Sequence, residues 1–193
     1  MKTLLFFSLL TICFLPFVQA QNHYVDISAG ISSFHLPAPD YKFSGTNPIV
    51  NIGLHRFTGP KENLSIGVQI AIARNKTQGD AYQVHGSIHY SPVKSKYISL
   101  SIGTGLGYQI SKYSSSSLIW NKNEWHQGKK YKGVMPIPID LSLSFKRLSI
   151  DNNFIQPFIS YRLQSHLRYS SNLNPLPKSN FLVGIKLINS KNN

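Results

Sequence analysis

The chain has 193 residues, which suits a single domain, and its single cysteine excludes a fold held by internal disulfides. Its 20 Lys and Arg residues outnumber 7 Asp and Glu, giving a net charge of +13. A charge of this size fits a nucleic-acid partner, but the export signal described next argues against one. Anionic lipid head groups are the expected neighbours. A basic bias of solvated loops is the alternative explanation.

The N-terminal segment has the pattern of a cleaved secretory signal. Residues 1–20 carry one early positive charge, then an apolar run, then small side chains up to Ala20. We therefore expect residues 21–193 to form the mature protein as one barrel domain. Cys13 follows Ile12, where a lipoprotein signal has Gly or Ala, so no lipid anchor is expected. A buried N-terminal strand or helix is the alternative for this segment.

After this signal, apolar residues alternate with small or polar ones in eight segments. Only a β-strand sorts such residues onto two opposite faces, because a helix would scatter them around its circumference. The clearest segments are 64–73 and 98–111. Weaker copies lie in 25–31, 50–54, 82–90, 137–145, 159–163 and 181–187.

The segments and their connections predict an all-β fold, an eight-stranded antiparallel up-and-down transmembrane barrel. Many segments approach the ten or so residues that a tilted strand needs to cross a bilayer, and no apolar run is long enough for a spanning helix. The connections alternate in length, as outer loops and periplasmic turns do in such barrels. The longer ones are 34–48, 74–81, 112–133 and 170–180, and the shorter ones are 57–63, 91–96 and 146–153.

Prolines interrupt the pattern in two of the predicted strands. Pro136 and Pro138 fall where the sixth strand should begin, and Pro157 lies near the start of the seventh. Each proline removes a hydrogen-bond donor from the ladder. We therefore expect a bulge or a late start in the sixth strand.

The polar residues at alternate strand positions are expected to face inward. Because eight strands enclose a lumen that side chains just fill, they predict a packed, charge-balanced interior. Buried charges must be paired, and the expected neighbours are Asp26 with Lys186 and Asp140 with Arg162. Their expected role is structural.

Two histidines share the polar face of the segment 82–90. His85 and His89 are four residues apart, which on a strand separates them by about 13 Å. They cannot bind one metal together, so we expect lumen histidines satisfied by hydrogen bonds, with no metal and no cofactor.

The pattern resembles the small outer-membrane barrels of the OmpA/OmpX type, and particularly the PorT-like barrels of Bacteroidetes. The resemblance covers about residues 22–188 and rests on segments such as 102–108 and 181–187. It implies location in the bacterial outer membrane after export through the periplasm, contact with outer-membrane lipid and lipopolysaccharide, and assembly by the barrel insertion machinery. The PorT-like resemblance implies a component of an export or secretion apparatus with an envelope protein partner. Such barrels commonly end on an aromatic residue, whereas this chain continues through 189–193.

The segment 165–175 contains His166 and the pair Ser171 and Asn172. It is similar to the lipid A deacylases, barrel enzymes that have a His-x-Ser-Asn motif late in the chain and use a Ser/His/Glu mechanism. Here the residues two before Ser170 and Ser171 are Arg168 and Tyr169, and no acidic residue follows Asp151. A serine nucleophile needs an adjacent base, so two members of the triad are missing. We therefore expect no enzymatic activity, and a lipid A deacylase-like enzyme is the alternative.

The longest predicted outer loop holds both tryptophans and a cationic cluster, Trp120, Trp125, Lys129 and Lys130. Exposed Trp beside Lys suits a surface that binds a partner or lipopolysaccharide phosphates. A disordered basic loop with its Trp residues on the barrel rim is the alternative. The sequence thus favours a non-enzymatic envelope barrel, either structural or presenting its outer loops for interaction.

Overall fold

The computed structural model consists of β-strands and their connections throughout the part of the chain that it describes. That part contains no helix long and apolar enough to cross a membrane. The expected signal, residues 1–20, lies outside it. The described residues are 23–35, 45–58, 62–75, 79–113, 116, 118–121, 124–150, 153–167 and 175–189.

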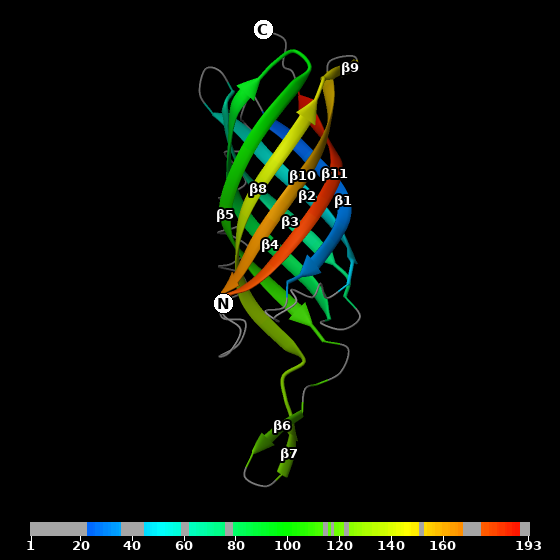
Figure 1. Ribbon diagram of the computed structural model, residues 1–193, viewed down its shortest axis with the longest axis vertical. Coiled ribbons are helices and arrows are strands. Elements are labelled where there is room, and N and C mark those ends of the chain that lie inside the picture. Colours follow the sequence, from blue (N-terminus) through cyan, green and yellow to red (C-terminus); the bar gives the residue numbers. More distant parts are fainter. Residues whose placement is uncertain are drawn as a thin grey trace, which may run out of the picture.

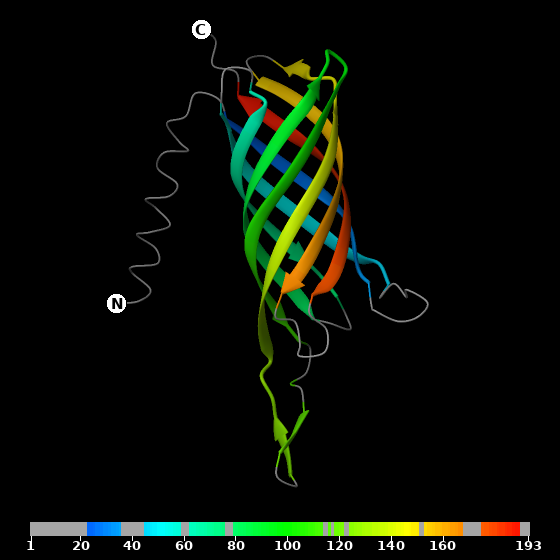
Figure 2. The ribbon, with the colours of Figure 1, turned by 60° about the vertical axis from the view of Figure 1, so that its left-hand side comes forward.

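Eight strands form one closed antiparallel barrel, as the alternating pattern predicts. Strand β1 pairs with β2 on one side and with β11 on the other, and β11 also pairs with β10, which closes the sheet (Figures 1 and 2). The barrel strands are β1 (His23–Phe34), β2 (Asn47–Thr58), β3 (Leu64–Ala73), β4 (Asp80–Lys94), β5 (Ile98–Lys112), β8 (Tyr131–Phe145), β10 (Asn153–Leu167) and β11 (Leu176–Asn189).

The two ends of the barrel differ. At the end where β1 begins and β11 ends, here called the termini end, the strands are joined by short connections, such as 95–97 between β4 and β5. A short strand, β9 (Leu148–Ile150), extends the connection between β8 and β10 there. At the opposite end, the hairpin end, strands β6 (Leu118–Asn121) and β7 (Glu124–Gln127) form a two-stranded ribbon that projects beyond the barrel (Figure 2).

The outward parity of the strands carries an almost uninterrupted apolar belt. Ile52 is 54% exposed and its partners on the adjoining strands, Ile27 and Ile70, are also exposed. Soluble monomers rarely expose so large a continuous apolar surface. A belt of this kind is what a strand face turned toward hydrocarbon requires.

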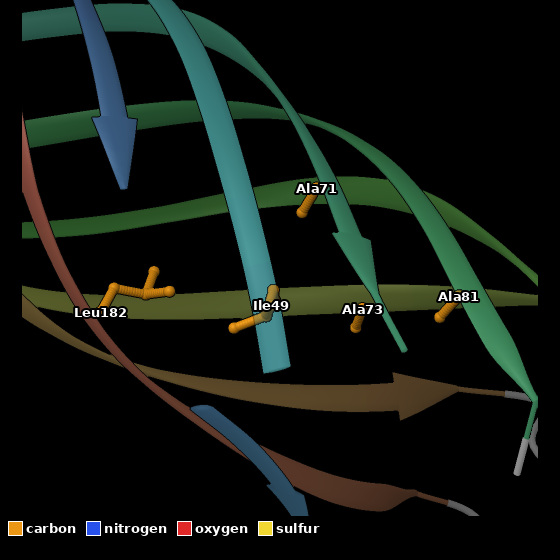
Figure 3. Packing of buried hydrophobic residues seen from close by; sticks show 5 residues of the cluster. All are labelled: Ile49, Ala71, Ala73, Ala81 and Leu182. Carbon is orange, nitrogen blue, oxygen red and sulfur yellow. The ribbon is translucent and has the colours of Figure 1, made fainter. Parts of the chain in front are cut away.

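The inward parity is mostly polar, with a small apolar cluster inside the barrel (Figure 3). Its members are buried and come from β2, β3, β4 and β11: Ile49, Ala71, Ala73, Ala81 and Leu182. The alanines leave room for the larger polar side chains of the lumen.

The prediction of a bulge or a late start at the two prolines is wrong. Strand β8 begins at Tyr131, and Pro136 and Pro138 pair in register with β10. On the other side of β8 the ladder to β5 is interrupted between the Thr104 and Gln109 positions. Alternate residues of a strand point their N–H groups to the same neighbour, so both missing donors fall on the β5 side. The barrel tolerates them as one local gap.

Two other predicted boundaries also shift. Strand β11 begins at Leu176, so residues 176–180, expected in an outer loop, belong to the barrel wall. Part of the predicted long loop 112–133 forms the β6–β7 hairpin. Pro157 lies where the partner of β10 changes from β8 to β9, which places its missing donor between two ladders.

A charge in the middle of the apolar belt should destabilise the barrel far more than one at its edge. Ile52→Lys should lower the free energy of unfolding in lipid vesicles by about 2–4 kcal/mol. Ile98→Lys, at the first residue of β5, is the control and should cost only about 0–1 kcal/mol, because lysine there reaches the interface. Urea titration measures both, and equal costs would contradict a lipid-facing belt.

Candidate functional site: the polar lumen and its open end

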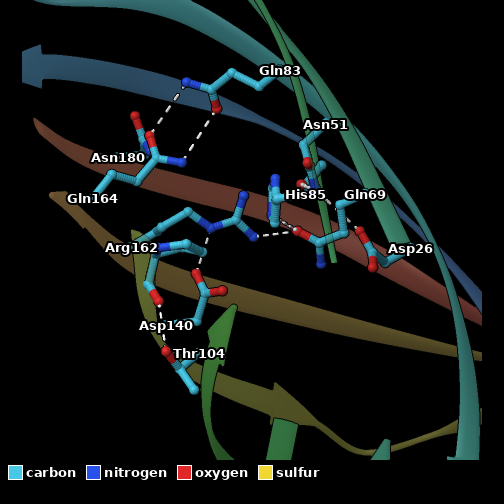
Figure 4. A network of polar contacts seen from close by, with 12 residues as sticks. Asp26, Asn51, Gln69, Gln83, His85, Thr104, Asp140, Arg162, Gln164 and Asn180 are labelled. Atoms are coloured by element: carbon cyan, nitrogen blue, oxygen red, sulfur yellow. Dashed lines mark hydrogen bonds and ion pairs between the residues drawn. The ribbon is translucent and has the colours of Figure 1, made fainter. Parts of the chain in front are cut away.

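An arginine crosses the middle of the lumen. Arg162 on β10 binds Asp140 on the adjacent strand β8 through Nε at 2.5 Å, so the structure brings this expected pair together. Its Nη2 donates to Gln69 Oε1 on β3, four strands away by either route around the barrel, at 2.5 Å. His85 Nε2 donates to the same amide oxygen, with 2.8 Å between Nε2 and Oε1. Figure 4 shows this bridge, which obstructs the lumen between opposite walls.

The expected pair of Asp26 with Lys186 does not form an ion pair, although the two residues are Cα partners. The Asp26 carboxylate instead binds His55 Nε2 at 2.6 Å and accepts from Asn51 at 3.2 Å. The Lys186 ammonium donates to Ser144 Oγ at 2.8 Å. A lysine stem is long enough to reach past its cross-strand partner, so register alone did not determine its contact.

A layer of amide side chains lies nearer the hairpin end. Gln83 and Gln164 bind each other across the lumen at 3.2 and 3.4 Å, and Asn180 donates to Gln164 at 3.2 Å. Gln83 also donates to Gln109, whose own amide donates to Ser111. Buried amides are stable only when paired in this way.

The two histidines of β4 lie in different surroundings. His85 belongs to the central bridge, whereas His89 packs edge-on against His55, with ring centroids 5.4 Å apart. His55 in turn stacks on Tyr24 at 4.7 Å. Within the described ranges no group of three His, Cys, Asp or Glu side chains is placed to hold a metal ion.

Glycines on the inward face make room for these rings. A Cβ added at Gly67 would lie 2.2 Å from His55 Nδ1, and one at Gly103 would lie 2.3 Å from His89 Nδ1. Both distances are far inside van der Waals contact. The glycines at every second position of β5 are therefore part of the packing of the lumen.

A cavity of about 490 Å³ occupies the termini half of the lumen. It runs from the level of Arg162 and Asp140 to the turns at the termini end, where Lys96 and Arg147 line it. The expectation of a filled interior is therefore wrong in this half. Lys146 is exposed in the turn after β8 and lines the mouth of the cavity.

The hairpin end carries the other predicted site. Trp120 and Trp125 are Cα partners across β6 and β7, and their side chains lie outside what the structure describes. Lys129 and Lys130 are exposed where the chain returns to the barrel. The Tyr113 amide donates to the Lys130 carbonyl at 3.0 Å, which fixes the base of the hairpin.

The deacylase-like reading has little support from the described residues. His166 lies fully buried in the lumen, edge-on to Phe34 with 5.5 Å between ring centroids. Ser170 and Ser171 lie outside the described residues.

Several lumen residues were missed by sequence reasoning, among them Gln83, Gln164 and Lys178. Gln83 and Gln164 share the parity of His85 and Arg162, so period two could have found them. Lys178, fully buried with its ammonium 5.4 Å from the Phe34 ring centroid, fell within the connection 170–180 that was expected to be an outer loop.

The chain matches no known protein-family model and no curated protein sequence. It is similar to the crystal structure of Neisserial surface protein A, with 9% identity over 86% of this chain and 96% of that one, at a TM-score of 0.57. It is also similar to Ail, the attachment invasion locus protein of Yersinia pestis, with 14% identity over 88% and 99% of the two chains, at a TM-score of 0.52. The chain therefore has the fold of the small outer-membrane barrels.

Removing one partner of the central ion pair should be costly. Asp140→Ala leaves the Arg162 guanidinium buried and uncompensated, which typically lowers the free energy of unfolding by about 3–5 kcal/mol. The midpoint of the heat-dependent gel shift should fall accordingly. Adding Arg162→Met should recover part of the loss, because no isolated charge remains; an unchanged midpoint in the single variant would contradict the buried pair.

Filling the space beside His55 should also destabilise the barrel. Gly67→Ala places a methyl group against the ring and should cost about 1–3 kcal/mol in the same measurement. Gly86→Ala is the matched control, because the nearest atom to its added Cβ is 4.0 Å away. Equal effects of the two changes would show that His55 does not occupy this place.

Proposed function

We propose that this chain is an outer-membrane protein without enzymatic activity of its own, which presents its hairpin end outside the cell to polyanionic surfaces. The phosphate groups of lipopolysaccharide are the first candidate ligand. The observation that carries this proposal is the ribbon that projects beyond the barrel with exposed Lys129 and Lys130 at its base (Figure 2).

Membrane location is supported by the outer surface. The charged residues at outward positions of the described barrel strands are Arg56, Asp80 and Lys112, and all three lie at or close to strand ends. Everything between them is apolar or small, as a surface in hydrocarbon requires. The closed sheet leaves no edge exposed to lipid.

The connection lengths support an orientation. Outer-membrane barrels carry longer loops outside the cell and short turns in the periplasm. The connections 35–46 and 113–130 lie at the hairpin end, whereas 59–63 and 95–97 lie at the termini end. The hairpin would therefore face outward, where lipopolysaccharide is the neighbouring lipid.

The chemistry at the hairpin base suits an anionic ligand. Lys112 and Tyr131 are Cα partners beside Lys130, and Lys112, Tyr131 and Lys130 are all exposed. Ammonium groups attract phosphates as point charges, and aromatic residues pack against sugar and lipid at the same level. Ail, a barrel of the same fold, has been crystallised in complex with the heparin analogue sucrose octasulfate, a sulfated polyanion.

Neutralising the hairpin base should weaken binding to lipopolysaccharide. Each lysine near an anionic surface contributes about 1 kcal/mol, so Lys129→Gln with Lys130→Gln should lose about thirtyfold in affinity for immobilised lipopolysaccharide. Trp120→Ser with Trp125→Ser should weaken binding without changing its salt dependence. Arg56→Gln with Lys96→Gln, near the termini end, removes the same charge and is the control.

Three outcomes would overturn this proposal. One is equal loss in the hairpin variant and its charge-matched control, which would indicate attraction by net charge alone. Another is recovery of one stoichiometric envelope protein from detergent-solubilised membranes by a chain that binds no lipopolysaccharide, which would favour the PorT-like alternative of an export component. The third is release of acyl chains from lipid A by the purified chain, which would favour the enzyme.

A further inference from the structure

The cavity at the termini end is lined by more cationic than acidic side chains. Six Lys and Arg residues line it against three carboxylates. Each carboxylate already has a cationic or histidine partner: Asp26 has His55, Asp140 has Arg162, and Glu62 has Arg147. Positive charge therefore remains in an enclosed space that no described carboxylate neutralises.

Lys186, on β11, lies further into the barrel than the other lysines of this cavity, which lie at a strand end or in the turns. It is partly buried and forms no ion pair with a described carboxylate. Its ammonium binds Ser144 Oγ and lies 5.6 and 5.2 Å from the ring centroids of Tyr24 and Phe158. A partly desolvated ammonium is costly without a counter-ion, and rings offset only part of that cost.

The cavity around this ammonium is lined by further hydroxyl groups, and lysines line its mouth. Ser99 and Ser101 line the same cavity, and Lys96 and Lys146 line its mouth from two neighbouring turns. Phosphate monoesters carry close to two negative charges and three acceptor oxygens, which several ammonium and hydroxyl donors can satisfy together. The cavity volume of about 490 Å³ lies within the range of small-molecule sites.

Glu62, in the connection between β2 and β3, lies at the mouth of this cavity and contacts two of its cationic residues. Its carboxylate lies 3.5 Å from Arg147 in the turn after β8, and its carbonyl accepts from the Lys94 ammonium at 2.5 Å. Its backbone φ of 51° lies in the left-handed region, uncommon for a residue with a side chain. The turn thus holds one carboxylate against the cations that an entering anion would meet.

We propose that this cavity binds a small soluble phosphate monoester entering from the termini end, with Lys186 as its deep contact and Glu62 as a built-in competitor at the mouth. The site is separate from the hairpin end, so it stands or falls independently of lipopolysaccharide binding. With the termini end in the periplasm, the ligand would be a periplasmic solute.

The test is calorimetric titration of the full mature chain, in non-ionic detergent, with glycerol 3-phosphate. We expect saturable binding at one site and none with glycerol. Lys186→Gln should weaken binding at least about tenfold, since it removes a charge-assisted hydrogen bond. Glu62→Gln should strengthen it by about threefold to tenfold, since it removes a like charge from the mouth. Arg74→Gln, at an exposed position just after β3 at the hairpin end, is the charge-matched control and should leave the affinity unchanged.

Three results would overturn the proposal: no saturable heat, equal weakening by Lys186→Gln and Arg74→Gln, or no gain from Glu62→Gln. Binding only to vesicles that contain phosphatidylglycerol would also overturn it, because the phosphate would then belong to a lipid head group. If Lys186→Gln does not fold, Lys146→Gln in the exposed turn replaces it and should weaken binding by about threefold.

Discussion

The absence of water in hydrocarbon is the constraint on which this structure depends. Every backbone N–H and C=O at membrane depth must find a partner within the protein, because an unsatisfied group there costs several kcal/mol. The pairing of β1 with β11 from Tyr24 to Phe34 meets this requirement by leaving the sheet no edge. The prolines of β8 are tolerated because their missing donors are confined to one gap in the ladder between β5 and β8.

Once the sheet is closed, alternate side chains of each strand face the surrounding lipid and the barrel lumen. Outward positions must be apolar, and inward positions must pair with one another inside a narrow lumen. Arg162 does this by binding both its neighbour Asp140 and the opposite wall through Gln69. Inward glycines such as Gly67 are required because the rings of His55 and its neighbours take the space.

Much of this could be predicted from the sequence because two-faced alternation survives in every barrel strand. The pair of Asp140 and Arg162 could be predicted because the two residues are Cα partners on adjacent strands, and the guanidinium binds the carboxylate directly beside it. Asp26 could not be matched in the same way, since its carboxylate reaches diagonally to His55 and Asn51 while Lys186 extends past it. The termini-end cavity depends on how side chains fill a volume, which alternation does not encode.

The two ends of the barrel differ in chemistry as well as in shape. At the hairpin end exposed lysines lie at the base of the ribbon, whereas at the termini end lysines line a cavity with Glu62 at its mouth. The amide layer of Gln83 and Gln164 and the Arg162 bridge lie between these ends. Ligands at one end would therefore not exchange freely with the other, and two separate surfaces could serve two separate ligands.

The central claim is that successive residues face lipid and lumen in turn. Cys13, in the expected signal, is the chain's one cysteine, so single cysteines can be placed in the mature chain at 50–53 of β2 and labelled with a fluorophore. In vesicles of brominated lipid, labels at Val50 and Ile52 should be strongly quenched and labels at Asn51 and Gly53 should be protected. Uniform quenching along the segment, or a mature chain that remains in buffer without lipid, would contradict the account.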